Sequence, residues 1–254
     1  MEAKKKFELT NDVIEIDGIT LHRIKALKDF SDVKAGDLGG WIEKEENLSQ
    51  IGNAWVYNNA KVYGDAKICY HSKVCDNAKV YNHVTICGNA RVCGDAVVFD
   101  NVIVFDNVMV CGNAKVYGNA MVYGDAKIYN NAMVYDHAMI GNYAIVSGNA
   151  HVYGHAIVEG NAVIRGDAVV RDNVKVFGNA IIDNYAIVSD NAIVYGDASV
   201  CCCALVCGNA IVSDNAIVYG DAEICGYARI DGGTMVAGNT KVCGNEVIRN
   251  NANY

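Results

Sequence analysis

Hydrophobic positions recur every six residues along this 254-residue chain, from Gly52 to the C-terminus. Every sixth residue from Val56 onward is Val or Ile, and most of the positions counted in sixes from Ala54 are Ala. Two consecutive positions between them are nearly always Gly, Asn, Asp or His, and the phase never slips. A strict short period of this kind predicts a solenoid that repeats one small structural unit.

The spacing predicts the shape of that unit. Val and Ile favour a pleated, half-buried surface, so each one marks the centre of a short strand whose two neighbours point outward. Gly, Asn and Asp tolerate left-handed backbone geometry and therefore form the corner, with the small residue tucked inside it. Three such sides make one coil of 18 residues. We therefore predict an all-β, triangular parallel solenoid of about 11 coils.

Other repeat architectures fit this period less well. Pentapeptide solenoids need a period of five, the calcium-binding nonapeptide motif is absent, and a helical array would need apolar spacings of three and four. The [Val/Ile]-x-[Gly/Asn]-[Asn/Asp]-Ala-x unit, present over residues 52–252, resembles that of the hexapeptide-repeat superfamily. The resemblance implies a left-handed parallel β-helix, although the usual crossover rule predicts the opposite hand.

Residues 1–51 lack the repeat and are expected to form a separate N-terminal cap, with the solenoid covering residues 52–254. Residues 13–24 alternate around Asp17 and Gly18, which predicts a β-hairpin with a type I′ turn. A cap would cover the open strand edges of the first coil. This leader resembles that of uncharacterised bacterial and phage hexapeptide-repeat proteins, which imply no established activity.

Composition narrows the possible partners and compartment. The net charge of −8 and a pI of about 5.2 argue against binding to nucleic acid or to an anionic membrane. The sequence shows neither an 18-residue apolar run nor a signal peptide, so we expect a cytoplasmic protein. In that compartment its 11 cysteines are expected to be reduced thiols.

Because residue n stacks on residue n+18, outward-facing columns follow directly from the sequence. One column is aromatic in six successive coils, at Tyr63, Tyr81, Phe99, Tyr117, Tyr135 and Tyr153. These rings are candidate binding residues, since aromatic platforms stack on flat ligands, sugars or other proteins. The alternative is that neighbouring rings only stabilise one another, by roughly 0.2–1 kcal/mol per pair.

A second set of outward positions is aliphatic in the later coils. The candidate oligomer interface consists of Ile145, Val163, Ile181, Ile187, Leu205 and Tyr254. Exposed apolar rows favour lateral association into a dimer or trimer, whereas β-propensity on a solvated face is the alternative explanation. Tyr254 is included because the C-terminus carries no capping helix, which suggests a tail-to-tail dimer.

Histidine and cysteine columns are the candidate chemical groups. His137 and His155 occupy the same corner of adjacent coils and are the candidate metal ligands, although His also tolerates the corner geometry that Asn and Asp adopt there. Cysteine columns include Cys75, Cys93 and Cys111, which are at the right spacing to bind metal or form disulfides, or are simply reduced thiols. We assign no catalytic residue, no metal and no cofactor from the sequence.

Two functions from different classes remain. The first is a non-catalytic rigid scaffold whose flat faces bind itself and an unidentified protein or small ligand; a phage-borne protein directed at a host defence component is one version of it. The second is an acyltransferase-like enzyme with its site between subunits, as the resemblance implies for some relatives. That site is expected to need a loop inserted between coils, and the unbroken repeat lacks one. The sequence therefore favours binding over catalysis.

Overall fold

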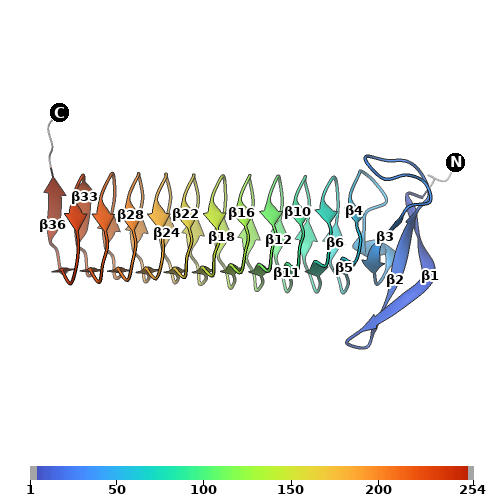
Figure 1. Ribbon diagram of the computed structural model, residues 1–254, viewed down its shortest axis with the longest axis horizontal. Helices are drawn as coiled ribbons and strands as arrows, with labels where there is room; N and C mark the ends of the chain where they lie inside the picture. The colour runs from blue at the N-terminus through green and yellow to red at the C-terminus, as the bar shows by residue number, and fades with distance from the viewer. Residues whose placement is uncertain (1–4, 251–254) are drawn as a thin grey trace. The chain divides into compact units, whose positions relative to one another are not determined.

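The computed structural model describes residues 5–250, and its chain divides into two compact units, residues 1–124 and 125–254. Both units are built from short β-strands (Figure 1). The helical content of the described residues is one 3₁₀ turn, η1 (Glu45–Asn47). No helix in that part of the chain is long and apolar enough to cross a membrane.

The first unit begins with the predicted hairpin. Strands β1 (Phe7–Ile16) and β2 (Ile19–Ala26) pair antiparallel, and the turn places Asp17 at φ 51° and Gly18 at φ 79°. Two successive positive φ values are what a type I′ turn requires, so the hairpin prediction is confirmed. Its strands extend beyond residues 13–24 at both ends.

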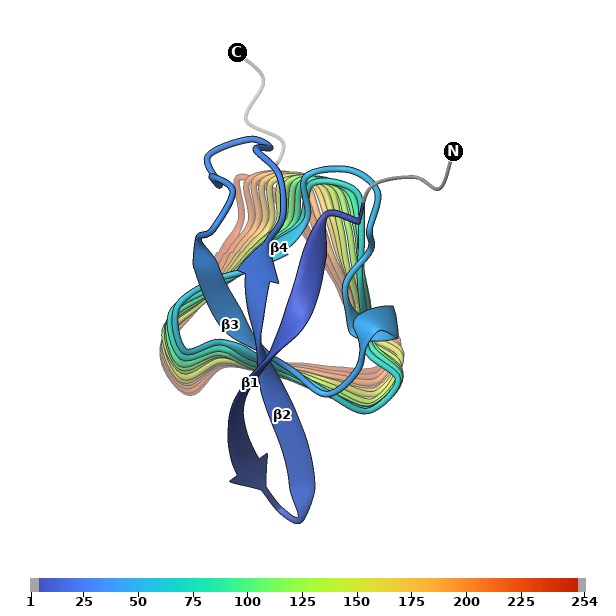
Figure 2. The ribbon, with the colours of Figure 1, turned by 90° about the vertical axis from the view of Figure 1, so that its right-hand side faces the viewer.

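The coil starts before the sequence repeat does. Strand β3 (Leu38–Ile42) pairs antiparallel with β2 and parallel with β5 (Lys61–Val62), and Leu48 forms a parallel bridge to Ile68 (Figure 2). Residues 38–51 therefore supply backbone hydrogen bonds to the next coil without the repeat pattern. Buried Lys6 closes this end by donating from Nζ to the carbonyl of Ala54 at 2.9 Å, and burial together with nearby Lys28 lowers its pKa to about 8.

Three parallel sheets form the sides of the coils in the first unit. The first sheet continues from β3 with β5 (Lys61–Val62), β8 (Lys79–Val80), β11 (Val97–Val98) and β14 (Lys115–Val116). The second contains β4 (Trp55–Val56), β7 (Lys73–Val74), β10 (Arg91–Val92) and β13 (Met109–Val110). The third contains β6 (Lys67–Ile68), β9 (Thr85–Ile86), β12 (Ile103–Val104) and β15 (Met121–Val122).

The second unit has the same three-sided arrangement. One sheet contains β17 (Met133–Val134), β20 (His151–Val152), β23 (Val169–Val170), β26 (Ile187–Val188), β29 (Leu205–Val206), β32 (Glu223–Ile224) and β35 (Lys241–Val242). Another contains β16 (Lys127–Ile128), β19 (Ile145–Val146), β22 (Val163–Ile164), β25 (Ile181–Ile182), β28 (Ser199–Val200), β31 (Ile217–Val218) and β34 (Met235–Val236). The third contains β18 (Met139–Ile140), β21 (Ile157–Val158), β24 (Lys175–Val176), β27 (Ile193–Val194), β30 (Ile211–Val212), β33 (Arg229–Gly232) and β36 (Val247–Asn250).

Each strand presents one side chain inward and one outward, as the period predicts. In β23, Val170 is fully buried while Val169 is half-exposed. The backbone bonds to the next coil, as in the 2.9 Å hydrogen bond from the Ile187 amide to the Ala204 carbonyl. Corner residues such as Asn184 (φ 59°) have left-handed backbone geometry. The predicted all-β parallel solenoid with an N-terminal hairpin is confirmed, with β3 adding a partial turn to the expected coils.

Amide ladders at the corners are a feature that the sequence analysis did not predict. The Asn131 side chain donates to Asn149 at 2.9 Å, and Asn149 donates to Asp167 at 2.8 Å. Each partner lies 18 residues further along the chain. The second corner position therefore links successive coils, in addition to tolerating the turn.

The expectation of reduced thiols is wrong for four cysteines. Cys69–Cys87 and Cys225–Cys243 are disulfides between adjacent coils, with Cα–Cα distances of 4.9 and 4.6 Å. The stacking distance itself lies within the 4.4–6.8 Å range that disulfides usually span, so any stacked cysteine pair is close enough to bond. Cys75, Cys93 and Cys111 are free thiols.

Candidate functional site

The predicted aromatic column forms a continuous stack of rings in the first unit. Ring centroids are 4.9 Å apart for Tyr63–Tyr81, 5.2 Å for Tyr81–Phe99 and 4.9 Å for Phe99–Tyr117, with interplanar angles of 5–7°. In a parallel stack each inner ring has both faces covered by its neighbours. The strip therefore presents ring edges and hydroxyl groups to a partner, and a flat ligand has no inner ring face on which to stack.

Tyr63 at the start of this stack is only 7% exposed. Burial raises the pKa of its hydroxyl to about 12, with smaller contributions from Tyr81 and from Asp17 in the hairpin turn. Its residual exposure leaves little of this ring for a ligand. The accessible part of the candidate binding column in this unit begins at Tyr81, which is half-exposed.

In the second unit, Tyr135 and Tyr153 of the predicted column also stack, with centroids 4.7 Å apart at 6°. His151 meets Tyr135 edge-on at 6.3 Å. Two further stacks, Phe105–Tyr123 and Phe177–Tyr195, escaped the sequence analysis. The signal for both was present, because each pair is separated by 18 residues.

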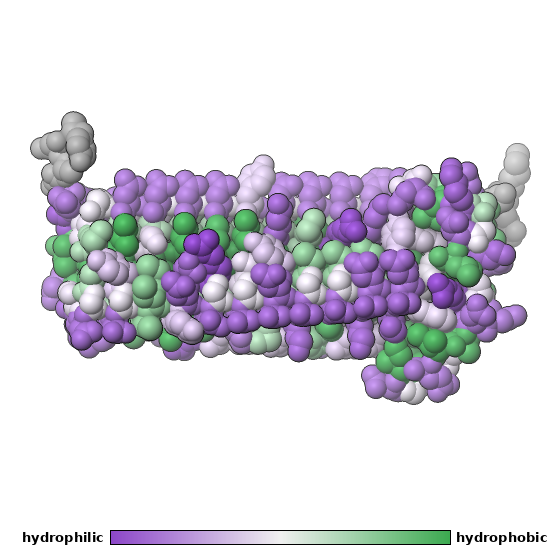
Figure 3. Space-filling view, viewed as in Figure 1, coloured by the Kyte–Doolittle hydropathy of each residue, from purple (hydrophilic) through white to green (hydrophobic). Residues whose placement is uncertain are grey.

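The predicted interface residues fall on two different sheets. Ile145, Val163 and Ile181 are in register on β19, β22 and β25. Ile187, which is 37% exposed, and Leu205 are in register on β26 and β29. Leu205 is half-exposed, as are Ile145, Val163 and Ile181. Tyr254 lies outside the described residues. Hydrophobic side chains on the face shown in Figure 3 form separate groups among polar ones.

The two candidate metal-binding histidines stack on one another. His137 and His155 are both exposed, with ring centroids 4.7 Å apart at 20°. In the described part of the chain, two groups bring three potential ligand atoms within 4.8 Å of one another, and neither contains a histidine. Stacked rings turn their faces, and not their nitrogen lone pairs, toward each other, which does not favour a shared ion between them.

A polar cavity of about 180 Å³ lies between the leader and the first coils. Its lining consists of Asp32, Tyr57, Asn58, Lys73, Cys75, Asp76 and Arg91. Asp32 Oδ1 accepts hydrogen bonds from the Tyr57 hydroxyl and from Lys73 Nζ, both at 2.8 Å. The Lys73 ammonium also lies 5.3 Å from the centre of the Tyr57 ring.

Charge in this cavity is fixed by those contacts. The hydrogen bond from Lys73 lowers the pKa of Asp32 and raises that of Lys73, so both are ionised at neutral pH. Burial, together with the bond to Asp32, raises the pKa of Tyr57 to about 12. Tyr57 therefore stays protonated and donates to Asp32, and the cluster is suited to orienting polar groups rather than to accepting a proton.

This cavity was not predicted from the sequence. Stacking by 18 residues aligns Tyr57 with Cys75 and Lys73 with Arg91, and both alignments could have been found from the repeat. Asp32 belongs to the non-repetitive leader, and no periodicity places its carboxylate. A second, more apolar cavity of about 340 Å³ is lined by Ser49, Ile51, Gly52, Cys69, Tyr70 and His71.

Known proteins with a similar repeat match short parts of this chain. The family described as YdcK Beta solenoid repeat matches residues 114–127 and 204–220. The "Uncharacterized acetyltransferase YdcK" of Escherichia coli (strain K12) is 50% identical over 40 residues, which is 16% of this chain and 12% of that relative. These matches confirm the predicted resemblance to the hexapeptide-repeat superfamily.

Solved structures that are similar to this chain include one of an acyltransferase. Its title is "Activity and Crystal Structure of Arabidopsis UDP-N-acetylglucosamine acyltransferase". The match covers 68% of this chain and 70% of that chain, with 17% sequence identity and a TM-score of 0.35.

Proposed function

We propose that this protein is a non-catalytic, rigid binding scaffold that associates with a second copy through its aliphatic rows and offers its aromatic strips to a protein or small ligand. The observation that supports the proposal best is the row of Ile145, Val163 and Ile181, which are half-exposed and in register on three consecutive strands. An ordered row of this kind presents apolar area that a flat partner surface covers without rearrangement.

Rigidity makes such a surface effective. The outward side chains stand on strands that are hydrogen-bonded to the next coil, and the aromatic neighbours are stacked 4.7–5.5 Å apart. Binding to groups already held in place loses less conformational entropy than binding to a mobile loop. This preorganisation favours recognition by shape and by ring edges.

We expect Val163→Glu to shift the protein from dimer or trimer to monomer. The charge would lie between Ile145 and Ile181 and would have to be desolvated in the interface. The measurement is molar mass by light scattering, across a range of concentrations that includes the micromolar. Ile187→Glu tests the second row in the same way.

Val97→Glu is the matched control. Val97 is also half-exposed on a strand, and its register neighbours Lys79 and Lys115 favour a carboxylate there. This variant should keep the wild-type mass. A wild-type chain that is monomeric at micromolar concentration, or variants that all behave alike, would contradict association through these rows.

An acyltransferase-like activity with its site between subunits is the second candidate. The observation in its favour is the local match to a relative whose name includes acetyltransferase. If this candidate is right, acetyl-coenzyme A binds the wild-type protein in calorimetry, and the monomeric Val163→Glu variant loses that binding. If the scaffold proposal is right, neither protein binds it.

A further inference from the structure

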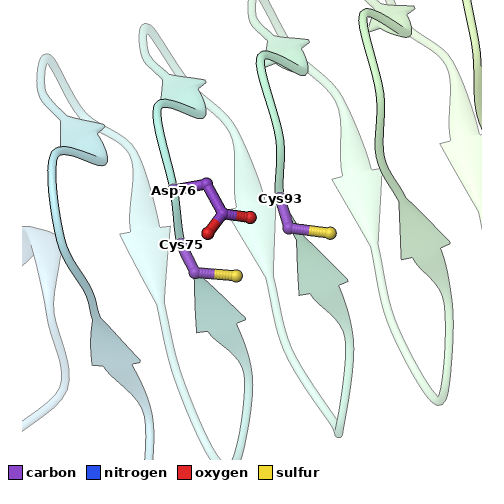
Figure 4. A group of neighbouring side chains, drawn as sticks. All are labelled: Cys75, Asp76 and Cys93. Carbon is purple, nitrogen blue, oxygen red and sulfur yellow. The ribbon is translucent and has the colours of Figure 1, made fainter.

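Two thiols and one carboxylate converge beside the polar cavity of the first unit. Cys75 and Cys93 directly follow β7 and β10 and stack on adjacent coils, while Asp76 occupies the corner after Cys75 (Figure 4). One ligand atom from each of the three lies within 4.8 Å of the other two. In Figure 4 the Asp76 carboxylate turns toward the two sulfur atoms.

We infer that Cys75, Cys93 and Asp76 bind a thiophilic divalent cation, with Zn²⁺ as the expected ion. Zinc accepts cysteine sulfur at about 2.3 Å and carboxylate oxygen at about 2.0–2.2 Å, and is usually four-coordinate. Three protein ligands then leave one coordination position for water or an exogenous ligand. Cys75 and Asp76 themselves line the cavity that also contains Tyr57 and Lys73, so that position is expected to face it.

The carboxylate is already oriented for this role. Asp76 Oδ2 accepts a hydrogen bond from the Gly94 amide at 2.9 Å, and the Asp76 backbone is held at φ 62° by the corner. Because Oδ2 is bonded to the adjacent coil, the Asp76 side chain is held in one rotamer, and its Oδ1 is left to coordinate the ion. Supporting hydrogen bonds of this kind commonly orient metal ligands.

The surrounding charge also suits a divalent ion. Two thiolates and one carboxylate carry three negative charges, which a divalent cation and the adjacent Arg91 guanidinium together neutralise. Burial raises the pKa of Cys75 to about 11, an effect that Arg91 partly opposes. Burial also raises the pKa of the Cys93 thiol, and metal binding to the two thiols displaces their protons to solvent.

Co²⁺ titration of the full chain tests the site, because cobalt bound by thiolates gives a charge-transfer band in the near ultraviolet. A non-thiol phosphine keeps the cysteines reduced. We expect a band that saturates near one equivalent, and Zn²⁺ should abolish it by displacement. A wild-type chain without such a band would overturn the inference.

Matched variants locate the ion. The phosphine also opens Cys225–Cys243, which with Glu223 forms the other group of three potential ligands, so Cys225→Ser/Cys243→Ser is the control pair. We expect the control pair to keep the band and Cys75→Ser/Cys93→Ser to lose it. Should Cys75→Ser unfold the chain by circular dichroism, the half-exposed Cys93→Ser alone serves the same purpose.

Two single changes test the third ligand. Asp76→Asn should weaken Co²⁺ binding by more than the ~10–100-fold that loss of an outer-shell partner costs. Cys111→Ser, one coil beyond Cys93, should leave the affinity unchanged. A band that survives Cys75→Ser/Cys93→Ser, or that depends on Cys111 and not on Asp76, would overturn the assignment.

Discussion

Val170→Asp is expected to abolish the native fold of the second unit, whereas Val169→Asp is expected to preserve it. Val170 is fully buried, and its register neighbours on the adjacent coils, Val152 and Val188, are apolar and fully buried as well. An unpaired buried charge costs several kcal/mol, a large share of the ~5–15 kcal/mol that stabilises a typical domain. Val169 is half-exposed, so the same carboxylate would remain hydrated there.

The two variants share residue type, strand and substitution, and they differ only in the direction of the side chain. Soluble yield and the thermal midpoint by far-ultraviolet circular dichroism report the outcome. We expect Val169→Asp to melt within several degrees of the wild type, because surface substitutions usually change stability by less than ~0.5 kcal/mol. Equal losses in both variants would mean that alternate residues do not separate core from solvent.

Gly154→Val is the second change for which we expect a large effect. Gly154 has φ +73°, and a Cβ there would lie 2.6 Å from the backbone nitrogen of Asp172 on the next coil. A β-branched residue in left-handed geometry is a genuine outlier, with a strain of about 1–3 kcal/mol, and the close backbone contact adds to that cost. We expect destabilisation of roughly 2–4 kcal/mol.

Gly154→Asn is the informative comparison. Asn occupies the equivalent corner position at Asn130, Asn142 and Asn184, each with positive φ. Because the corner accommodates Asn at these three positions, this variant should lose less than about 1 kcal/mol. Denaturant unfolding of the wild type and both variants gives the ranking. If Asn and Val destabilise the chain equally, the corner geometry is not what selects Gly and Asn.

Much of this fold could be predicted from the sequence because each coil repeats the same physical solution. The Val or Ile at every sixth position fixes which side chains point inward, and the Gly, Asn and Asp pairs fix the corners. The Asp17–Gly18 turn was also predictable, because few residue pairs tolerate two positive φ values. Handedness came from resemblance, since neither alternation nor spacing distinguishes a coil from its mirror arrangement.

The candidate sites were less predictable because they depend on how side chains meet. The aromatic column was correctly placed in register, but only the structure shows that its ring faces cover one another and that Tyr63 is buried. Asp32 contributes to the polar cavity from a loop outside the repeat, so its position could not be predicted from the 18-residue spacing. The 18-residue repeat was enough to predict that stacked cysteines lie within disulfide-bonding distance. It could not predict which of these thiols are oxidised.

Removal of residues 157–174 is the most direct test that side chains stack in columns 18 residues apart. This deletion takes out one full coil and joins Ala156 to Lys175 in the same phase, so every remaining column is restored. Removal of residues 157–171 joins Ala156 to Asp172 and shifts the phase by half a repeat, which turns polar residues inward. Thermal unfolding followed by circular dichroism should show a cooperative β-sheet transition near the wild-type midpoint for the longer deletion and none for the shorter one. Loss of the transition in both chains, or its survival in both, would contradict the account.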